Sequence, residues 1–434
     1  MSYVNKAVMK PNTIYILLLL LSVGAFNVNN AQQSIIHDNM VYVPYIKSVT
    51  FAHRSLSTSL PIIDLNSEFE GELRLEFDDM EGGFKNYTYS IVHCDKDWYP
   101  SNLLEIEYLE GFNNEEIDQF AYSSNPYSEY THYTLDLPNF DVKWLISGNY
   151  LLTVMDDDFE VPVITRRFMV AENNVAIGYN LFRPRNLQKM NTHHELEISL
   201  NFENLILSRP REELYVSIVQ NGNWNSAIHN QQGNFTVGDE LRFDQYDQIT
   251  FPALKEFRSF DIRTLQFTTA FVNSIDRNDR MTNVLLDLNK RRYDRNFVSE
   301  ADANGFFVLD NQDVRNPTVS SEYCNVILNL ESYKKFDHEL YIVGAFSDWQ
   351  AKEEYRLEYD PTRELYLGQA LFKQGYYDYM FAVKKEDGFL DIQFAEGSYY
   401  ETENDYLIIV YYRPLGAEFD RIVGVANFNS SPGN

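Results

Sequence analysis

Apolar and polar residues alternate with a period of two along most of this chain. The segment 71–77 places Leu73, Leu75 and Phe77 on one face, and the segment 194–202 gives the cleanest alternation. Because successive side chains of a strand point to opposite faces of a sheet, this pattern predicts half-buried β-strands. The three-and-four spacing of long helices is nowhere sustained over four turns, so the sequence predicts an all-β protein.

The strand-like segments recur about every 8 to 12 residues with turn residues between them, which is typical of β-sandwiches. Segments 150–158 and 161–170 predict a hairpin, and the Asn-Gly pair at Asn221 and Gly222 predicts another tight turn. Four more strands are expected beyond residue 338. The sequence therefore predicts tandem β-sandwiches of the immunoglobulin-like or early-set kind.

The period-two pattern lapses near residues 172–192 and near residues 299–318, where polar residues, Gly and Pro collect. A chain of 434 residues is also too long for one core of ordinary size. The expected divisions are a signal peptide (1–31), an N-terminal β-sandwich (32–172), a middle β-sandwich (173–312) and a C-terminal β-sandwich with a short tail (313–434).

Composition narrows the class of partner. The chain has 31 Tyr and 30 Phe against 4 Trp, and Tyr and Phe favour half-buried pleated surfaces. It carries 36 Lys and Arg against 64 Asp and Glu, a formal net charge of −28. Such a surface repels phosphate backbones and anionic lipid headgroups, so neither nucleic acid nor the membrane surface is an expected partner. The charge favours either a soluble, self-repelling protein or one whose partner presents a basic surface.

The N-terminal segment indicates the compartment. Lys6 and Lys10 precede an apolar run over residues 14–26, which is too short to span a bilayer but suits a secretory signal. The expected cleavage follows Ala31 and leaves Gln32 as the first mature residue. An uncleaved anchor is the alternative, and the short run argues against it. The mature chain is expected to be exported, without direct membrane insertion.

The two cysteines, Cys94 and Cys324, are far apart in the sequence. An exported chain of this length with one possible pair is not a disulfide scaffold. A bridge between the two is one possibility, and two buried free thiols are the favoured one.

The segment YTYSIVHCDKDWYPS (87–101) places His93, Cys94 and Asp95 side by side, which suggests nucleophilic or metal chemistry. A cysteine nucleophile needs a base within hydrogen-bond reach, but the alternation puts His93 and Cys94 on opposite faces of a strand. Zinc needs further ligands at close spacing, and Cys94 has no second cysteine nearby. The residues are therefore predicted to form a strand end and an Asp-rich turn capped by Trp98.

Other chemistry-bearing residues have similar interpretations. His193 and His194 are adjacent, so on a strand they face opposite ways and make a poor metal pair. Asp156 to Asp158 lack the alternating ligand spacing of a dedicated calcium loop, and a solvated turn is favoured. No catalytic, cofactor-binding or metal site is predicted. A cysteine-dependent enzyme acting through Cys94 is retained as an alternative.

Several motifs in one order carry a family resemblance. They are Tyr89, His93, Cys94, Asp95, Trp98, Pro100 and Ser101, then EYLEGF (107–112), YTHYTLDLPN (130–139), Gly148, Asn149 and Tyr150 of SGNY, and Arg166 and Arg167 of TRRFMV. Together they resemble the plug protein family of the type IX secretion system of Bacteroidetes, formerly a domain of unknown function. The resemblance covers roughly residues 40–415.

The resemblance implies a function. A plug of this family is a non-enzymatic periplasmic protein, without a cofactor, that closes the inner mouth of a giant outer-membrane β-barrel translocon. The chain would then lie at the inner face of the outer membrane with that barrel as its partner. The motif residues are interpreted as packing signatures of the first domain, and no loop is assigned to the partner contact.

A second resemblance is local. LYIVGAFSDWQ (340–350) and GYYDYMFAV (375–383) resemble the early-set sandwich that binds glycogen and starch with two tryptophans and a lysine. Trp349 matches the first tryptophan, but Met380 stands for the lysine and Phe389 for the second tryptophan. An early-set-like fold without sugar binding is expected. A glycan-binding or glycan-processing protein is the alternative, which an exposed Trp349 would favour and a buried one would not.

Overall fold

The computed structural model describes most of the chain. The predicted cleavage between Ala31 and Gln32 lies outside the described residues, which are 34–67, 71–124, 127–278 and 280–431.

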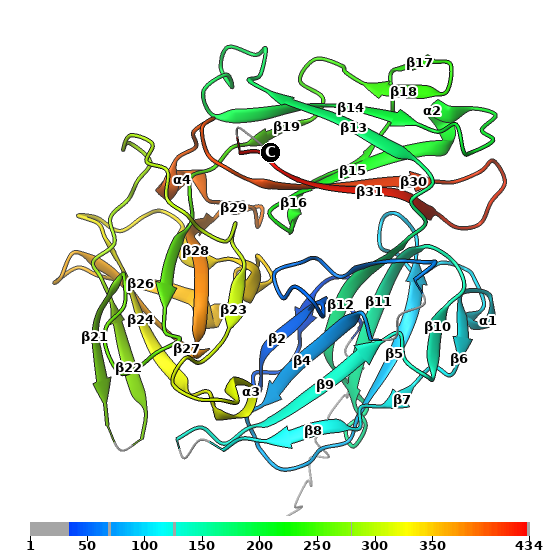
Figure 1. Ribbon diagram of the computed structural model, residues 1–434. Helices are drawn as coiled ribbons and strands as arrows, with labels where there is room; N and C mark the ends of the chain where they lie inside the picture. Colours follow the sequence, from blue (N-terminus) through cyan, green and yellow to red (C-terminus); the bar gives the residue numbers. More distant parts are fainter. Residues whose placement is uncertain (1–33, 68–70, 125–126, 279, 432–434) are drawn as a thin grey trace, which may run out of the picture. The chain divides into compact units, whose positions relative to one another are not determined.

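The chain divides into Met1–Ser34 and one compact unit, Ile35–Asn434. This unit is built almost wholly of β-sheets, most of them antiparallel, and the predicted all-β class of tandem β-sandwiches is confirmed (Figure 1). Among the described residues, no helix has the length and apolar character that crossing a membrane requires.

The first sandwich packs a six-stranded sheet against a four-stranded one. The six-stranded sheet has the order β1-β12-β11-β5-β7 with β3 beside β12, and its strands are β1 (Met40–Val41), β3 (Ile62–Asp64), β5 (Tyr87–Cys94), β7 (Glu115–Glu116), β11 (Gly148–Asp156) and β12 (Val161–Ala171). The second sheet has the order β2-β4-β9-β8, with β2 (Ile46–His53), β4 (Leu73–Asp79), β9 (Thr131–Leu137) and β8 (Gln119–Tyr122). A helical turn and a two-stranded ribbon complete it: α1 (Glu105–Tyr108), β6 (Leu109–Gly111) and β10 (Val142–Trp144).

The alternation read from the sequence sets the faces of this sandwich. Tyr87 and Tyr89 of β5 and Leu75 and Phe77 of β4 all point into the common core and are buried. The rings of Phe77 and Tyr87 meet edge to face with their centroids 5.3 Å apart. Because β4 and β5 belong to different sheets, this contact joins the two layers.

The middle sandwich also has two sheets. One has the order β13-β14-β18-β17 with β19 beside β14, and contains β13 (Ala176–Phe182), β14 (His193–Asn201), β17 (Phe235–Val237), β18 (Glu240–Phe243) and β19 (Thr250–Pro252). The other has the order β16-β15-β30-β31, with β15 (Leu214–Gln220), β16 (Asn223–Gln231), β30 (Asp405–Tyr412) and β31 (Arg421–Asn429). The short helix α2 (Pro210–Glu213) leads into β15.

The third sandwich is one continuous ten-stranded sheet that encloses a single core. Its order is β20-β28-β25-β26-β27-β24-β22-β21, with β23 and β29 beside β28. Its elements are β20 (Arg258–Asp261), β21 (Val272–Arg277), β22 (Thr282–Leu286), β23 (Phe307–Leu309), α3 (Pro317–Ser320), β24 (Tyr323–Glu331), β25 (Glu339–Val343), β26 (Arg356–Asp360), β27 (Leu365–Lys373), β28 (Gly375–Lys384), β29 (Leu390–Asp391) and α4 (Gln393–Glu396).

These sheets divide the chain differently from the boundaries expected at 173–312 and 313–434. β30 pairs with β15, with Val410 opposite Val216, so the chain returns to the middle sandwich after it has built the third. The third sandwich, from β20 to α4, is an insertion within the middle one, and it begins well before residue 312.

The reason for this difference lies in β30. Its even-numbered side chains, such as Ile408, belong to the core of the middle sandwich, and its odd-numbered ones, such as Ile409, pack against the first sandwich. A strand that is covered on both faces is apolar throughout, and such a run does not reveal which sheet it joins.

A buried charge cluster joins the first and third sandwiches. Asp78 of β4 is fully buried, and its Oδ2 accepts hydrogen bonds of 2.6 Å from Lys373 Nζ and from the Tyr323 hydroxyl. Its Oδ1 lies 2.7 Å from His132 Nδ1. Burial alone would raise the pKa of Asp78, but Lys373 and His132 together hold the pKa below the ordinary 3.8.

Removing the Asp78 charge should destabilise the protein strongly. Asp78→Asn leaves Lys373 buried without its counter-ion, and we expect a loss of about 3–5 kcal/mol in the free energy of unfolding, measured by urea titration. Adding Lys373→Met to that variant should recover part of the loss. Glu212→Gln, which breaks the exposed Arg209–Glu212 pair, should cost less than about 1 kcal/mol. Equal losses in Asp78→Asn and Glu212→Gln would contradict this account.

Candidate functional site

The motif residues around His93 gather at the end of β5, beside β11. Pairing of the two strands sets Cys94 opposite Asn149 and His93 opposite Tyr150, so two separate motifs of the sequence meet here. After Cys94 the chain turns at Asp95, whose Oδ1 accepts hydrogen bonds of 2.9 Å from the backbone N–H groups of Asp97 and Tyr99. This turn is stabilised by its own aspartate.

His93 is enclosed rather than presented to solvent. Its Nδ1 lies 3.0 Å from Ser101 Oγ, its Nε2 lies 3.4 Å from the Ser147 carbonyl oxygen, and Tyr150 packs edge-on against its ring. Burial lowers the pKa of His93 from 6.5 to about 4, so the ring is neutral. A Cβ on Gly148, whose φ is +151°, would come within 2.3 Å of Nε2. Gly148 is therefore required by the close approach of the imidazole.

Cys94 has the properties of a packed thiol. It is buried and unbridged, and its Sγ donates to the Val92 carbonyl oxygen at 3.7 Å. Burial raises the pKa of Cys94 to about 12, far from the lowered pKa of a reactive cysteine. Cys324, in β24 of the third sandwich, is also buried and unbridged.

Three of the motif residues, Trp98, Asn149 and Arg167, lie at the junction between the first and the middle sandwich. Trp98 is buried between the guanidinium group of Arg167, 4.7 Å from its ring centroid, and the ring of Trp224 in the middle sandwich, 5.1 Å away. Asn149 donates to the Asp95 carbonyl oxygen and accepts from the Tyr411 hydroxyl of β30 at 3.1 Å. These side chains couple the first sandwich to the middle one.

Three further motif residues have purely local contacts or reach the third sandwich. Tyr89 is buried in the first core, and its hydroxyl accepts from Asn139. Pro100 forms a β-bridge with Cys94. Arg166 lies 3.6 Å from Asp348 of the third sandwich.

The other candidate ligands are dispersed. His194 lies 2.8 Å from the Tyr406 hydroxyl and 2.7 Å from the Tyr400 carbonyl oxygen, whereas His193 contacts Thr192. Asp157 and Asp158 are exposed in the turn between β11 and β12, as expected, but Asp156 is the last residue of β11 and is buried. Within the described ranges, no group of three or more His, Cys, Asp or Glu side chains is arranged to hold a metal ion.

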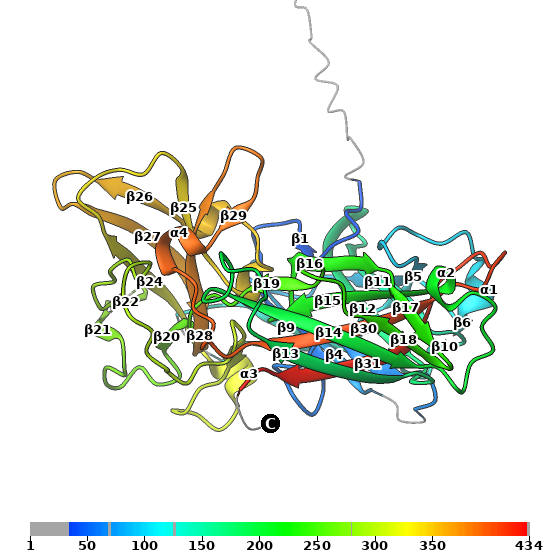
Figure 2. The same cartoon turned by 90° about the horizontal axis from the view of Figure 1, so that it is seen from above.

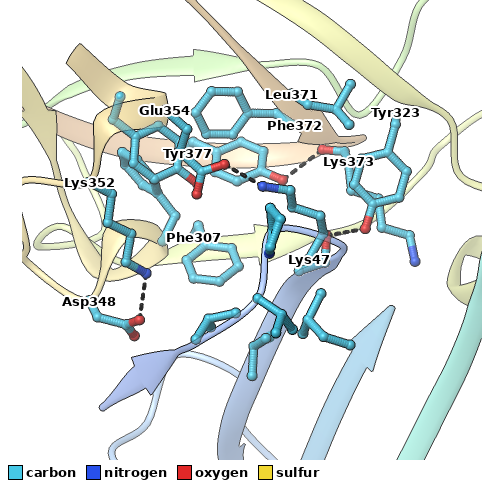
Figure 3. Close-up of a pocket in the computed structure, with 18 of the residues that line it drawn as sticks. Lys47, Phe307, Tyr323, Asp348, Lys352, Glu354, Leu371, Phe372, Lys373 and Tyr377 are labelled. Atoms are coloured by element: carbon cyan, nitrogen blue, oxygen red, sulfur yellow. Dashed lines mark hydrogen bonds and ion pairs between the residues drawn. The ribbon is translucent and has the colours of Figure 1, made fainter. Parts of the chain in front are cut away.

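A cavity of about 400 Å³ lies between the start of β2 and the third sandwich (Figure 3). A bulge in β2 between Lys47 and Thr50 turns Ser48 outward with a φ of +53°, and Ser48 Oγ lies 2.6 Å from the Tyr323 hydroxyl. Phe372 and Tyr377 provide apolar walls, and an ion pair between Lys47 and Glu354 closes one side. Charged groups at this cavity, such as Lys47 with Glu354 and Lys352 with Asp348, form ion pairs at the junction.

The tryptophan on which the glycan alternative depends is buried. Trp349 is 6% exposed and packs against Phe257, and Met380 is buried beside it. Phe389 is exposed on the turn between β28 and β29. A buried indole offers no face for a sugar to stack on, so the glycan alternative is not favoured.

The sequence did not reveal the Asp78 cluster. Asp78 follows Arg74 and Glu76 on the polar face of β4, where an aspartate ordinarily contacts water. The alternation identifies the outward face but not the domain that covers it. Neither Lys373 nor Tyr323 carries a local signal that would have pointed to Asp78.

Comparisons with known proteins agree with the motif analysis. Residues 46–172 match the family described as type 9 secretion system plug protein 1st domain, so the resemblance drawn from the motifs is confirmed and supports a role associated with type IX secretion. The match suggests a non-catalytic protein of the cell envelope. No curated protein has a significant match.

One solved structure shares the fold of nearly the whole chain. A hypothetical protein from Parabacteroides merdae, known from a crystal structure at 2.30 Å resolution, is 27% identical with a TM-score of 0.87, over 92% of this chain and 100% of that one. The C-terminal domain of the Streptococcus pyogenes antigen I/II-family protein AspA covers 88% of this chain and 99% of its own. Its identity is 8% and its TM-score 0.15, so it carries no argument.

Thiol titration tests the state of both cysteines. Because Cys94 and Cys324 are buried and unbridged, the folded chain should react with no equivalent of a thiol reagent, and the chain unfolded without reductant should react with two. A reactive thiol in the folded protein would favour the cysteine-enzyme alternative. No thiol in the unfolded protein would indicate a disulfide.

Acidification should destabilise the chain through His93. Its folded pKa of about 4 lies below the ordinary 6.5, so the unfolded chain binds more protons between these values and stability falls as the pH falls through them. Between pH 7 and pH 5 this group should cost about 2 kcal/mol. Urea unfolding of His93→Gln should show a pH dependence flatter by that amount, although the variant is less stable at pH 7. Equal pH dependence in the two proteins would contradict the assignment.

Proposed function

We propose that this chain, whose residues 46–172 form a type 9 secretion system plug domain, is a non-enzymatic periplasmic plug. It binds the periplasmic mouth of the giant outer-membrane β-barrel translocon of the type IX system and occludes it. The family match over the first sandwich is the observation that carries the proposal. In this proposal, the motif residues, including His93, Cys94 and Trp98, pack the interior and the junctions between domains.

The contacts among the three sandwiches suit a plug. A plug that closes a wide pore needs a broad and rigid surface, because a chain of loosely tethered domains would leave gaps. Here each sandwich contacts the other two through side chains: Asp78 reaches the third, Trp98 the middle, and Asn225 of the middle sandwich donates to the Trp349 carbonyl oxygen of the third. Such contacts oppose independent domain motion.

The charge supports a particular kind of partner. The net charge of −28 steers the chain toward a basic surface and away from anionic lipid, so the acidic plug would associate with a basic rim of the barrel. Reversible release is compatible with an interface of this kind, since electrostatic association depends on ionic strength.

Capture and conductance together test the proposal. The full chain with a C-terminal tag should co-purify a very large β-barrel protein from detergent-solubilised outer membrane, as identified by mass spectrometry and absent from a mock purification. In a planar bilayer, the purified barrel should lose most of its conductance when the chain is added to the periplasmic side. An unrelated protein of equal net charge should leave the conductance unchanged.

The two measurements separate binding from occlusion. Recovery of the chain alone under mild detergent would overturn the proposal. Co-purification without any change in conductance would retain the partner and overturn the plugging role.

A further inference from the structure

The ribbon of α1, β6 and β10, with the residues that flank it (104–112 and 140–145), is a small appendage of the first sandwich. Figures 1 and 2 place it at the end of that sandwich away from the third sandwich. Among the strands that the structure describes, β6 and β10 pair only with each other, with Val142 opposite Gly111.

The inner face of the ribbon anchors it firmly. Tyr108, Leu109 and Val142 are buried in the core of the first sandwich. A Cβ on Gly111, whose φ is +115°, would lie 1.8 Å from the Asp141 carbonyl oxygen, so only glycine permits this approach of the two strands. The Glu107 carboxylate accepts a hydrogen bond of 2.7 Å from the Leu104 N–H and fixes the start of α1.

The exposed side of the ribbon also carries large apolar side chains. Ile106 is 78% exposed, Phe112 is 69% exposed and Phe140 is 87% exposed, and Leu104 and Leu145 are exposed as well. The Phe112 N–H donates to the Asp141 carbonyl oxygen at 2.8 Å, which sets Phe112 next to the turn that carries Phe140. The buried inner face already holds the ribbon in place, so these outer side chains are not needed for folding.

Acidic groups lie among these apolar side chains along the ribbon. Glu105, Glu107 and Glu110 are exposed on the ribbon itself, and Asp141 is partly exposed. Lys143, which pairs across the ribbon with Glu110, is the only basic residue within 104–112 and 140–145. The exposed side of the ribbon thus combines large apolar groups with several acidic groups, which are called its acidic rim below.

We infer that the outer face of this ribbon is a docking surface for the translocon: an apolar recess on the periplasmic side of the barrel, rimmed by Lys and Arg, receives Ile106, Phe112 and Phe140. The inference rests on the proposed function for the identity of the partner. Apolar anchors supply most of the affinity of such an interface, and complementary charges at its rim guide association and orientation.

Charge complementarity favours this occupant over two others. A second copy of the chain would bring one acidic rim against another, which costs free energy. An anionic lipid surface would be repelled by the same rim. A rigid ribbon also loses little conformational entropy on binding, which suits a preformed docking surface.

Matched variants of the full chain test the inference. Ile106→Ser with Phe140→Ser removes two anchors, and Ile206→Ser with Phe389→Ser removes exposed side chains of the same two types from the other sandwiches. Binding to the purified barrel in detergent should weaken at least about tenfold for the first pair and stay within about twofold for the second. Thermal unfolding should be alike in all three proteins, because the four side chains are exposed.

A charge variant tests the rim. Glu105→Gln with Glu110→Gln should lower the association rate several-fold at low salt and leave the dissociation rate nearly unchanged. Glu203→Gln with Glu386→Gln, on the middle and third sandwiches, is the matched control and should have a smaller effect.

The outcomes are distinguishable. Absence of wild-type binding to the barrel would overturn both this inference and the proposed function. Equal binding by the wild type and by Ile106→Ser with Phe140→Ser would overturn the docking role of the ribbon and leave the proposed function standing. In a third outcome, the wild type floats with phosphatidylglycerol vesicles or forms a dimer in analytical ultracentrifugation. If Ile106→Ser with Phe140→Ser abolished the flotation or the dimer, the ribbon would bind lipid or a second copy, and the inference would be overturned.

Discussion

One buried carboxylate constrains the arrangement of the sandwiches. Asp78 lies where water cannot solvate it, and three of its partners come from two different sandwiches. While Asp78 is buried, its charge is fully compensated only if Lys373 and Tyr323 of the third sandwich remain in contact with the first, because Lys373 neutralises it and both groups donate hydrogen bonds to it. A buried ion pair of this kind contributes little to the free energy that holds the domains together. Its main effect is to specify how the domains are aligned.

The second constraint is topological. The middle sandwich is built from strands that precede the third sandwich in the sequence and from strands that follow it. The chain therefore crosses between these two sandwiches twice. The motif side chains then fix the first sandwich on the middle one: Trp98 is held between Arg167 and Trp224, and Asn149 links the turn after β5 to β30. Residues that resembled a reactive cluster in the sequence prove to be the inner lining of a domain junction, where burial lowers the pKa of His93 and raises that of Cys94.

Local structure could be predicted from the sequence, whereas most contacts between distant segments could not. Period-two alternation predicted the strands and the all-β class, and it placed His93 and Cys94 on opposite faces, because strand direction is a local property. It could not assign β30 to a sheet, because an apolar run is equally suited to any central position. It also could not mark Asp78 as buried or Phe140 as exposed, since both depend on which surface another part of the chain covers.

The late arrival of β30 bears on how the protein is made. A chain emerges from synthesis with its N-terminus first, so β15 exists long before the segment 405–412 that pairs with it. Until then the sequence LYVSIVQ (214–220) has one open backbone edge in an apolar strand, the kind of edge that recruits other chains into aggregates. Chaperones and proteases can recognise such an edge, so a product that stops short of Asp405 would be distinguished from a finished molecule by its own unfinished sheet.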